Sequence, residues 1–136
     1  GYVKNATISN VVMGAGSSIE ATYNGSGGIA GIVGFAEGTA NKILTNCVNY
    51  GNVTAKNTTD AKDIFCGGTI GTTATSKIAV KIENCINYGT VNSDGGRNCY
   101  TGGTMGCSAS NNTTMFNCAN VGDVTVIIRH QSDEPS

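Results

Sequence analysis

The chain has 136 residues, a net charge of −1 and only 12% charged residues. This length suits one domain, which can bury about two thirds of the surface that its unfolded chain exposes. The 8 lysines and arginines are spread singly along the chain, whereas a nucleic-acid-binding protein needs a basic stripe. No apolar run approaches the roughly 18 residues of a membrane-spanning helix. We therefore expect neither nucleic acid as a partner nor direct membrane insertion.

The composition is typical of a β-protein with tight corners. The chain contains 20 glycines and 1 proline, and it is rich in threonine, valine, isoleucine and asparagine. Threonine, valine and isoleucine favour strands, while glycine and asparagine favour turns. The hydrophobic content of 39% is too high for a disordered segment.

Two sequence blocks recur in a fixed order along the chain. A weak first copy occupies residues 8–14 (ISNVVMG) and 19–21 (IEA). The first complete copy has a Gly-Gly block at 27–31 (GGIAG) and an Asn-Cys block at 46–53 (NCVNYGNV). The Gly-Gly block returns at 67–71 and 102–106, and the Asn-Cys block returns at 84–91 and 117–124.

The spacing of these copies indicates stacked strands. The Asn-Cys block returns after 38 and then 33 residues, and no residue is inserted within a block. Each block is too short, and too rich in glycine and β-branched residues, to form a helix. A single repeat cannot bury its own apolar face, whereas stacked repeats can.

We therefore expect an all-β fold, a short parallel β-solenoid similar to a right-handed β-helix, with about three and a half repeats. One solenoid domain would span residues 1–130, followed by a polar tail at 131–136. The repeats would lie at approximately 8–26, 27–66, 67–101 and 102–128.

The favoured arrangement has one coil per repeat. In the second copy its strands would be residues 44–48, 52–55 and 65–72. The alternative has two smaller coils per repeat, one for each block. Both arrangements place equivalent blocks in register, so both remain open.

Equivalent residues of neighbouring coils would lie about 4.8 Å apart and form columns. Four columns are apolar and are expected in the core: Leu44, Ile82 and Met115; Cys47, Cys85 and Cys118, with Val11 in the weak copy; Val53, Val91 and Val124; and Ala30, Ile70 and Met105. Two further columns are asparagine, whose stacked amides can hydrogen-bond from coil to coil: Asn10, Asn46, Asn84 and Asn117; and Asn49, Asn87 and Asn120.

A glycine column, Gly28, Gly68 and Gly103, has two explanations. Glycine adopts positive φ at a corner, and it also lets another layer approach closely.

The alternation of the Gly-Gly and Asn-Cys blocks resembles the GLUG-type repeat, over about residues 8–126. That repeat occurs in large secreted or wall-attached bacterial proteins, including non-catalytic regions of some immunoglobulin A proteases. The chain departs from the family at Thr69 and Thr104, where an aliphatic residue is usual, and in its longer spacing through residues 56–63. The resemblance implies an exported, surface-displayed structural or adhesive region and carries over no catalytic residue.

The 6 cysteines do not form an obvious disulfide framework. Cys47, Cys85 and Cys118 share a column that Val11 also fills, so we expect cysteine to act there as a small hydrophobic residue. We predict that these three thiols are unbridged and react poorly in the folded chain. No Cys-x-x-Cys pair occurs, and a structural zinc site needs four closely spaced ligands, so we expect no metal or other cofactor.

Acidic residues are too scattered for an evident glycosidase pair, which needs two carboxylates across the scissile bond. Asp60 and Asp63 are the exception, because they share a segment with Lys56 and Lys62. A solvated loop tip is one interpretation of this cluster. The other is a weak glycan site formed by Asp60, Asp63 and Arg97.

The sequence thus favours a non-catalytic structural or adhesive repeat module of a bacterial cell-surface or secreted protein. Its partner would be a surface ligand, either a host protein or a glycan. A glycan-binding or glycan-cleaving β-helix is the alternative function.

The ends of the repeat array carry their own expectation. No Gly-Gly block follows residues 124–128, which are apolar and strand-like. An uncovered terminal coil exposes apolar side chains and strand edges. We therefore expect end-to-end association, or continuation into neighbouring repeats, with residues 124–128 at the contact.

Overall fold

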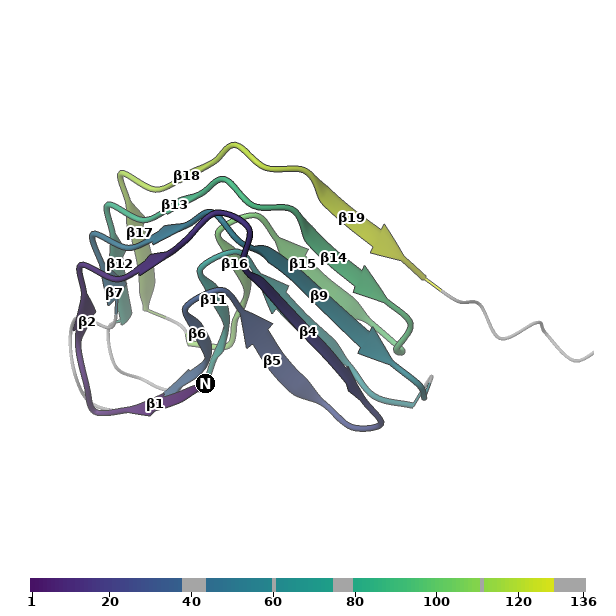
Figure 1. Ribbon diagram of the computed structural model, residues 1–136. Coiled ribbons are helices and arrows are strands. Elements are labelled where there is room, and N and C mark those ends of the chain that lie inside the picture. The colour runs from purple at the N-terminus through teal and green to yellow at the C-terminus, as the bar shows by residue number, and fades with distance from the viewer. Residues whose placement is uncertain (38–43, 60, 75–79, 111, 129–136) are drawn as a thin grey trace, which may run out of the picture.

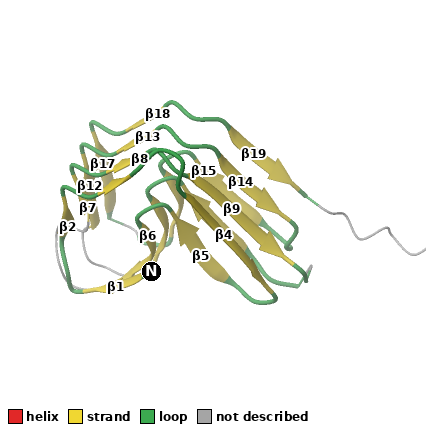
Figure 2. Ribbon diagram, viewed as in Figure 1, coloured by secondary structure: helices red, strands yellow, loops and turns green. Residues whose placement is uncertain are grey.

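The computed structural model describes residues 1–37, 44–59, 61–74, 80–110 and 112–128. Within these ranges all regular structure is β, and the nineteen strands pair only in parallel. They form a β-solenoid of about three turns (Figures 1 and 2). The predicted all-β parallel solenoid is confirmed.

The strands build five parallel sheets, which we name A to E. Sheet A contains β1 (Tyr2–Lys4), β6 (Val33–Glu37), β11 (Ile70–Thr73) and β16 (Met105–Ser108). Sheet B contains β2 (Ile8–Ser9), β7 (Leu44–Thr45), β12 (Val80–Glu83) and β17 (Thr113–Phe116). Sheet C contains β3 (Val12–Met13), β8 (Val48–Asn49), β13 (Ile86–Asn87) and β18 (Ala119–Asn120).

The other two sheets complete each coil. Sheet D contains β4 (Ser18–Tyr23), β9 (Asn52–Asn57), β14 (Val91–Asp94) and β19 (Val124–Ile127), and sheet E contains β5 (Gly27–Ala30), β10 (Ile64–Gly67) and β15 (Cys99–Gly102). A full coil passes through sheets E, A, B, C and D in that order. Sheet C lies at the top of Figure 1, with sheet B on the left and sheet D on the right.

Each repeat makes one coil, because Leu44 pairs with Ile8 on one side and with Ile82 on the other. The alternative of two smaller coils per repeat is therefore wrong. The expected three strands per coil are also wrong, since a full coil has five. A corner at Asn46, with φ of 53°, separates β7 from β8, and residues 68 and 69 separate β10 from β11.

The core has two parts, because the chain turns back inward between sheets E and A. One cluster lies between sheets A and B and contains Val33, Ala36, Leu44, Cys47, Ile70, Val80, Ile82 and Cys85. The other lies between sheets D and E and contains Val53, Ala55, Ile64, Cys66 and Val91. Small and β-branched side chains dominate both clusters, because each cluster fills the space between only two sheets.

A column of glycines forms the inward corner between sheets E and A. The members are Gly31, Gly68 and Gly103, and their backbones approach the side chains of the inner asparagines. A Cβ on each would lie within 2.5 Å of an amide Cγ: Gly31 with Asn49, Gly68 with Asn87, and Gly103 with Asn120. None of the three has a positive φ, so close approach, and not corner geometry, requires glycine here.

The expected alignment of the first Gly-Gly block with the later copies is wrong by three residues. Gly28 therefore does not belong to the glycine column. Gly28 pairs with Phe65, whereas Ala30 pairs with Gly67, so Gly31 is the partner of Gly68. Likewise, Val33 and not Ala30 shares a column with Ile70 and Met105. Gly28 has a separate role, because its Cβ would lie 2.1 Å from the carbonyl oxygen of Gly34. That contact lets β5 and β6 fold closely together.

The other predicted columns are confirmed. The strand registers join Leu44, Ile82 and Met115, and they join Val53, Val91 and Val124. The inner members are fully buried, but Met115 is 45% and Val124 is 41% exposed. Both lie on the last described coil, which has a neighbouring coil on one side only.

We predict that Gly68→Ala lowers the free energy of unfolding by about 3 kcal/mol, the upper part of the range for overpacking. Its Cβ would meet the carbonyl oxygen of Gly103 at 1.9 Å and the Asn87 side chain at 2.2 Å. Gly14→Ala is the matched control, since its Cβ finds nothing within 4 Å. Urea denaturation measures both variants, and equal midpoints for the two would contradict the close-approach explanation.

Candidate functional site

An outer ladder of asparagines runs along the corner between sheets B and C. Asn10, Asn46, Asn84 and Asn117 all have positive φ, between 51° and 59°, which asparagine tolerates better than most residues. Each amide nitrogen donates to the amide oxygen of the preceding coil: Asn46 to Asn10 at 3.3 Å, Asn84 to Asn46 at 3.0 Å, and Asn117 to Asn84 at 2.8 Å. The predicted asparagine column is confirmed, and it stabilises the corner.

An inner ladder of asparagines lies between the two core clusters, against the glycine column. Asn49 and Asn87 are fully buried. Asn49 Nδ2 donates to Asn87 Oδ1 at 2.7 Å, and Asn87 Nδ2 donates to Asn120 Oδ1 at 2.7 Å. Each amide nitrogen also donates to a backbone carbonyl two residues ahead, such as that of Gly89. The buried amides are thus satisfied entirely within the coil stack.

The cysteine column lies beside the outer ladder. Cys47 and Cys85 are fully buried, whereas Cys118, on the last coil, is half-buried. Their thiols bond to backbone carbonyls, for example Cys85 Sγ to the Glu83 oxygen at 3.3 Å. All six cysteines are free, so the prediction that the column is unbridged is confirmed. Burial raises the pKa of Cys85 to about 12 and that of Cys66 to about 12.

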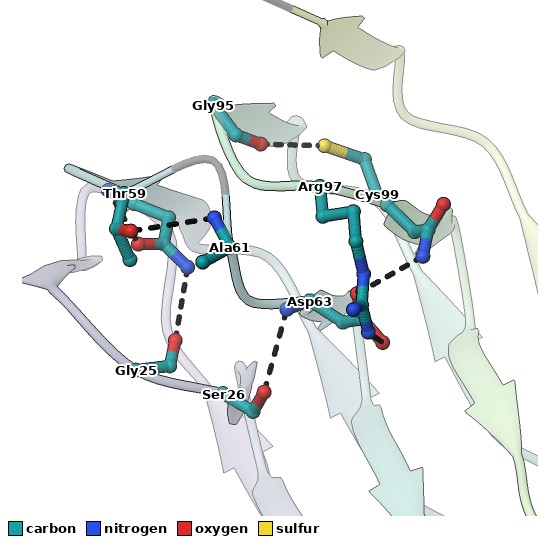
Figure 3. Close-up of polar contacts among 10 residues, drawn as sticks. Gly25, Ser26, Thr59, Ala61, Asp63, Gly95, Arg97 and Cys99 are labelled. Atoms are coloured by element: carbon teal, nitrogen blue, oxygen red, sulfur yellow. Dashed lines mark hydrogen bonds and ion pairs between the residues drawn. The ribbon is translucent and has the colours of Figure 1, made fainter.

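Two of the three candidate glycan residues, Asp63 and Arg97, lie at the rim where sheet D passes into sheet E. This rim comprises residues 24–26, 58–59, 61–63 and 95–98, which belong to the connections between the strands of those sheets in successive coils. The structure brings Asp63 and Arg97 together, with Nε to Oδ1 at 3.1 Å and Nη2 to Oδ2 at 3.3 Å (Figure 3). Asp60 lies outside the described residues.

At this rim Asp63 bonds to residues of both neighbouring coils. Asn98 Nδ2 donates to Asp63 Oδ1 at 3.0 Å, and the backbone nitrogen of Asp63 donates to Ser26 Oγ at 3.3 Å. The Arg97 backbone nitrogen donates to the Lys62 carbonyl at 2.7 Å. We call Ser26, Asp63, Arg97 and Asn98 the rim cluster. Its bonds join neighbouring coils in the same way as a strand ladder does.

The electrostatics of the rim cluster favour a charged carboxylate. The hydrogen bond from Arg97 is the main cause that lowers the pKa of Asp63 below its ordinary value, and the bond from Asn98 adds to it. A general acid for glycoside cleavage needs a raised pKa. The arrangement therefore suits a structural clasp better than a proton donor.

Three stacked aromatic pairs also follow the coil register. Tyr50 and Tyr88 stack with centroids 4.9 Å apart, Phe65 and Tyr100 with centroids 5.2 Å apart, and Tyr2 and Phe35 with centroids 5.7 Å apart. Tyr50 and Tyr88 are both 44% exposed at the corner between sheets C and D. They form an aromatic surface that the repeat positions hold rigidly.

Sequence reasoning missed several members of these sites. Ser26 and Asn98 carry no local motif, because they reach Asp63 only when coils stack. The stack of Phe65 on Tyr100 was also missed, although the alignment of residues 67–71 with 102–106 already places these two residues in one column.

Within the described ranges, no three of the His, Cys, Asp and Glu side chains are grouped as metal ligands. The same part of the chain forms no helix long and apolar enough to cross a membrane.

Comparison of the chain with protein-family models, with curated proteins and with solved structures found no match. The fold alone defines the class of protein, which is a parallel β-solenoid repeat protein. Its function is a proposal.

The clasp predicts a pH dependence for Asp63→Asn. The pKa of Asp63 is lower in the folded chain, so its stabilisation is present above the unfolded value of about 3.9 and is lost as the pH falls through the folded value. We expect the variant to melt a few degrees below wild type at pH 7 and level with it near pH 2. Thermal denaturation across this range measures the difference.

The control for this test is Glu20→Gln, which removes the exposed 3.0 Å ion pair with Lys56. Exposed pairs of this kind contribute little, so we expect almost no change in melting temperature. An Asp63→Asn effect no larger than that of Glu20→Gln at neutral pH would show that the rim cluster is not a clasp.

The thiols should react in the order of their burial. We predict that Cys47, Cys66 and Cys85 are alkylated only on unfolding, because all three side chains are fully buried. The raised pKa of Cys66 and of Cys85 further reduces their thiolate. Cys118 should react slowly, being half-buried. Mass spectrometry of iodoacetamide-treated native and denatured protein gives the order. Native labelling of Cys85 as fast as that of half-buried Cys107 would refute it.

Proposed function

We propose that the chain is a non-catalytic structural or adhesive repeat module of a bacterial cell-surface or secreted protein. One observation carries the proposal: the polar side chains that repeat from coil to coil bond to one another. The outer and inner asparagines form continuous ladders, so the most regular feature of the sequence serves rigidity. A stiff rod of this kind suits display away from a surface.

The GLUG-type resemblance supports the same function. The departures at Thr69 and Thr104 fit the fold, because both threonines are buried and their hydroxyls donate to carbonyls, Thr69 to the Thr104 oxygen at 2.9 Å. Threonine can therefore replace an aliphatic residue at this position. In the longer segment at residues 56–63, Lys56 and Asn57 still belong to β9, and residues 58–59 and 61–63 lie at the rim between sheets D and E.

Glycan binding is the second candidate, and the exposed Tyr50–Tyr88 stack favours it. Sugar rings present apolar C–H faces that pack on exposed aromatic rings. Asp63 and Arg97 remain the polar candidates, although their mutual ion pair competes with a ligand. Glycan cleavage is less favoured than binding, since the lowered pKa of Asp63 does not suit a general acid.

Two measurements test the proposal. Antibody against the chain should label intact cells of the encoding bacterium as strongly as lysed cells. In parallel, a reducing-sugar assay on common polysaccharides should detect no release. Labelling confined to lysed cells, or sugar release abolished by Asp63→Asn, would overturn the non-catalytic surface role.

A glycan array separates the structural from the glycan-binding role. If glycan binding occurs, Tyr50→Ala should weaken it at least about tenfold, as expected for the loss of a stacking anchor. Tyr100→Ala is the matched control, because Tyr100 is similarly exposed at 41% but belongs to another stack. Equal loss in both variants would place the site elsewhere.

A further inference from the structure

The two end faces of the solenoid carry complementary strand edges. Strands β16, β17, β18 and β19 are the last strands of sheets A to D, and β1, β2, β3 and β4 are the first strands of the same sheets. Among the described residues, each terminal strand pairs on one side only. The backbone groups on the other side can accept a further parallel strand.

The C-terminal face exposes side chains that every inner coil buries. Met115, Val124 and Val126 are 45%, 41% and 40% exposed. Their column neighbours, Ile82, Val91 and Ser93 respectively, are buried. The face also lacks the charges that usually protect a strand edge, because Asp123 is the only charged residue from Thr113 to Ile128.

The N-terminal face continues the same columns. Ile8 lies in the column of Met115, Ile19 in that of Val124, and Ala21 in that of Val126. All three are half-buried. A coil with this face stacked on the last coil would therefore continue two apolar columns, and a third column of small side chains that includes Ser93, without a change of register.

The direction of the outer asparagine ladder matches this stacking. Every amide nitrogen in it donates toward the N-terminal coil. Asn117 Oδ1 thus faces outward as an acceptor at the C-terminal face, and Asn10 Nδ2 faces outward as a donor at the N-terminal face. The inner ladder does not continue, because Met13 occupies the position of Asn49 in the first coil.

We propose that a second copy of this chain stacks head to tail, its β1–β4 edge pairing in parallel with the β16–β19 edge of the first copy. Among the described strands, sheet E contributes no edge strand to this junction, since its first strand, β5, lies one coil deeper. The contact is heterologous and does not close on itself, so further copies add in a row. This inference is independent of any surface ligand, because no glycan or host protein takes part.

The test blocks one face at a time. Val124→Lys should block the C-terminal face, and Val11→Lys, in the column of Cys118, should block the N-terminal face. Val11 is 39% exposed, so in the monomer the new lysine can reach water. A lysine buried without a partner at the junction should weaken association at least about tenfold. Thr125→Lys, on the outer side of β19, is the control and should leave association unchanged.

Sedimentation velocity over a concentration series gives the result. Wild type and the Thr125→Lys control should grow in mass with concentration, while each blocked variant alone stays monomeric. An equimolar mixture of Val124→Lys and Val11→Lys should form a dimer and nothing larger, because one good face of each variant remains. Circular dichroism confirms folding, and Val126→Lys replaces Val124→Lys if that variant unfolds.

Two outcomes would overturn the proposal. A wild-type chain that stays monomeric at every concentration would show that the edges do not pair. A mixture without dimer, combined with association of either blocked variant alone, would show a symmetric contact between like faces.

Discussion

The contact between the buried asparagine amides and the glycine column Gly31, Gly68 and Gly103 determines the cross-section of the whole coil. A buried amide must make its hydrogen bonds inside the protein or lose free energy. Asn49 and Asn87 do so with one another, with the amide of Asn120 and with nearby carbonyls. Only a backbone without a Cβ can lie against them, so the chain turns inward where glycine stands. Two separate cores follow from that inward turn.

Register is the property that this contact protects. A slip of one residue would reverse the faces of every strand, and it would also set a Cβ against an amide. Apolar columns alone tolerate exchange among valine, isoleucine and cysteine, so they specify register less sharply. The outer asparagines at φ near 55° and the clasp at Asp63 fix the corner and the rim. Loop length can therefore vary between coils without disturbing the sheets.

The repeats of the sequence predicted the parallel solenoid and most columns, because the Asn-Cys block has the same length in every copy. The Gly-Gly block was aligned by identity, and this placed Gly28 where Gly31 belongs. Residues 27–34 contain four glycines with different roles, and only alternating burial distinguishes them. The number of strands per coil was underestimated, since a two-residue strand such as β8 has no recognisable alternation. The rim cluster joins residues from three coils, so no local motif could indicate it.

The two asparagine ladders point in opposite directions along the solenoid. The outer amides donate toward the first coil and the inner amides donate toward the last. Aligned dipoles add up along an α-helix and charge its ends, whereas antiparallel rows of side-chain dipoles largely cancel. Each added coil therefore contributes almost no axial dipole from these amides. The array can lengthen without accumulating an electrostatic cost at its ends.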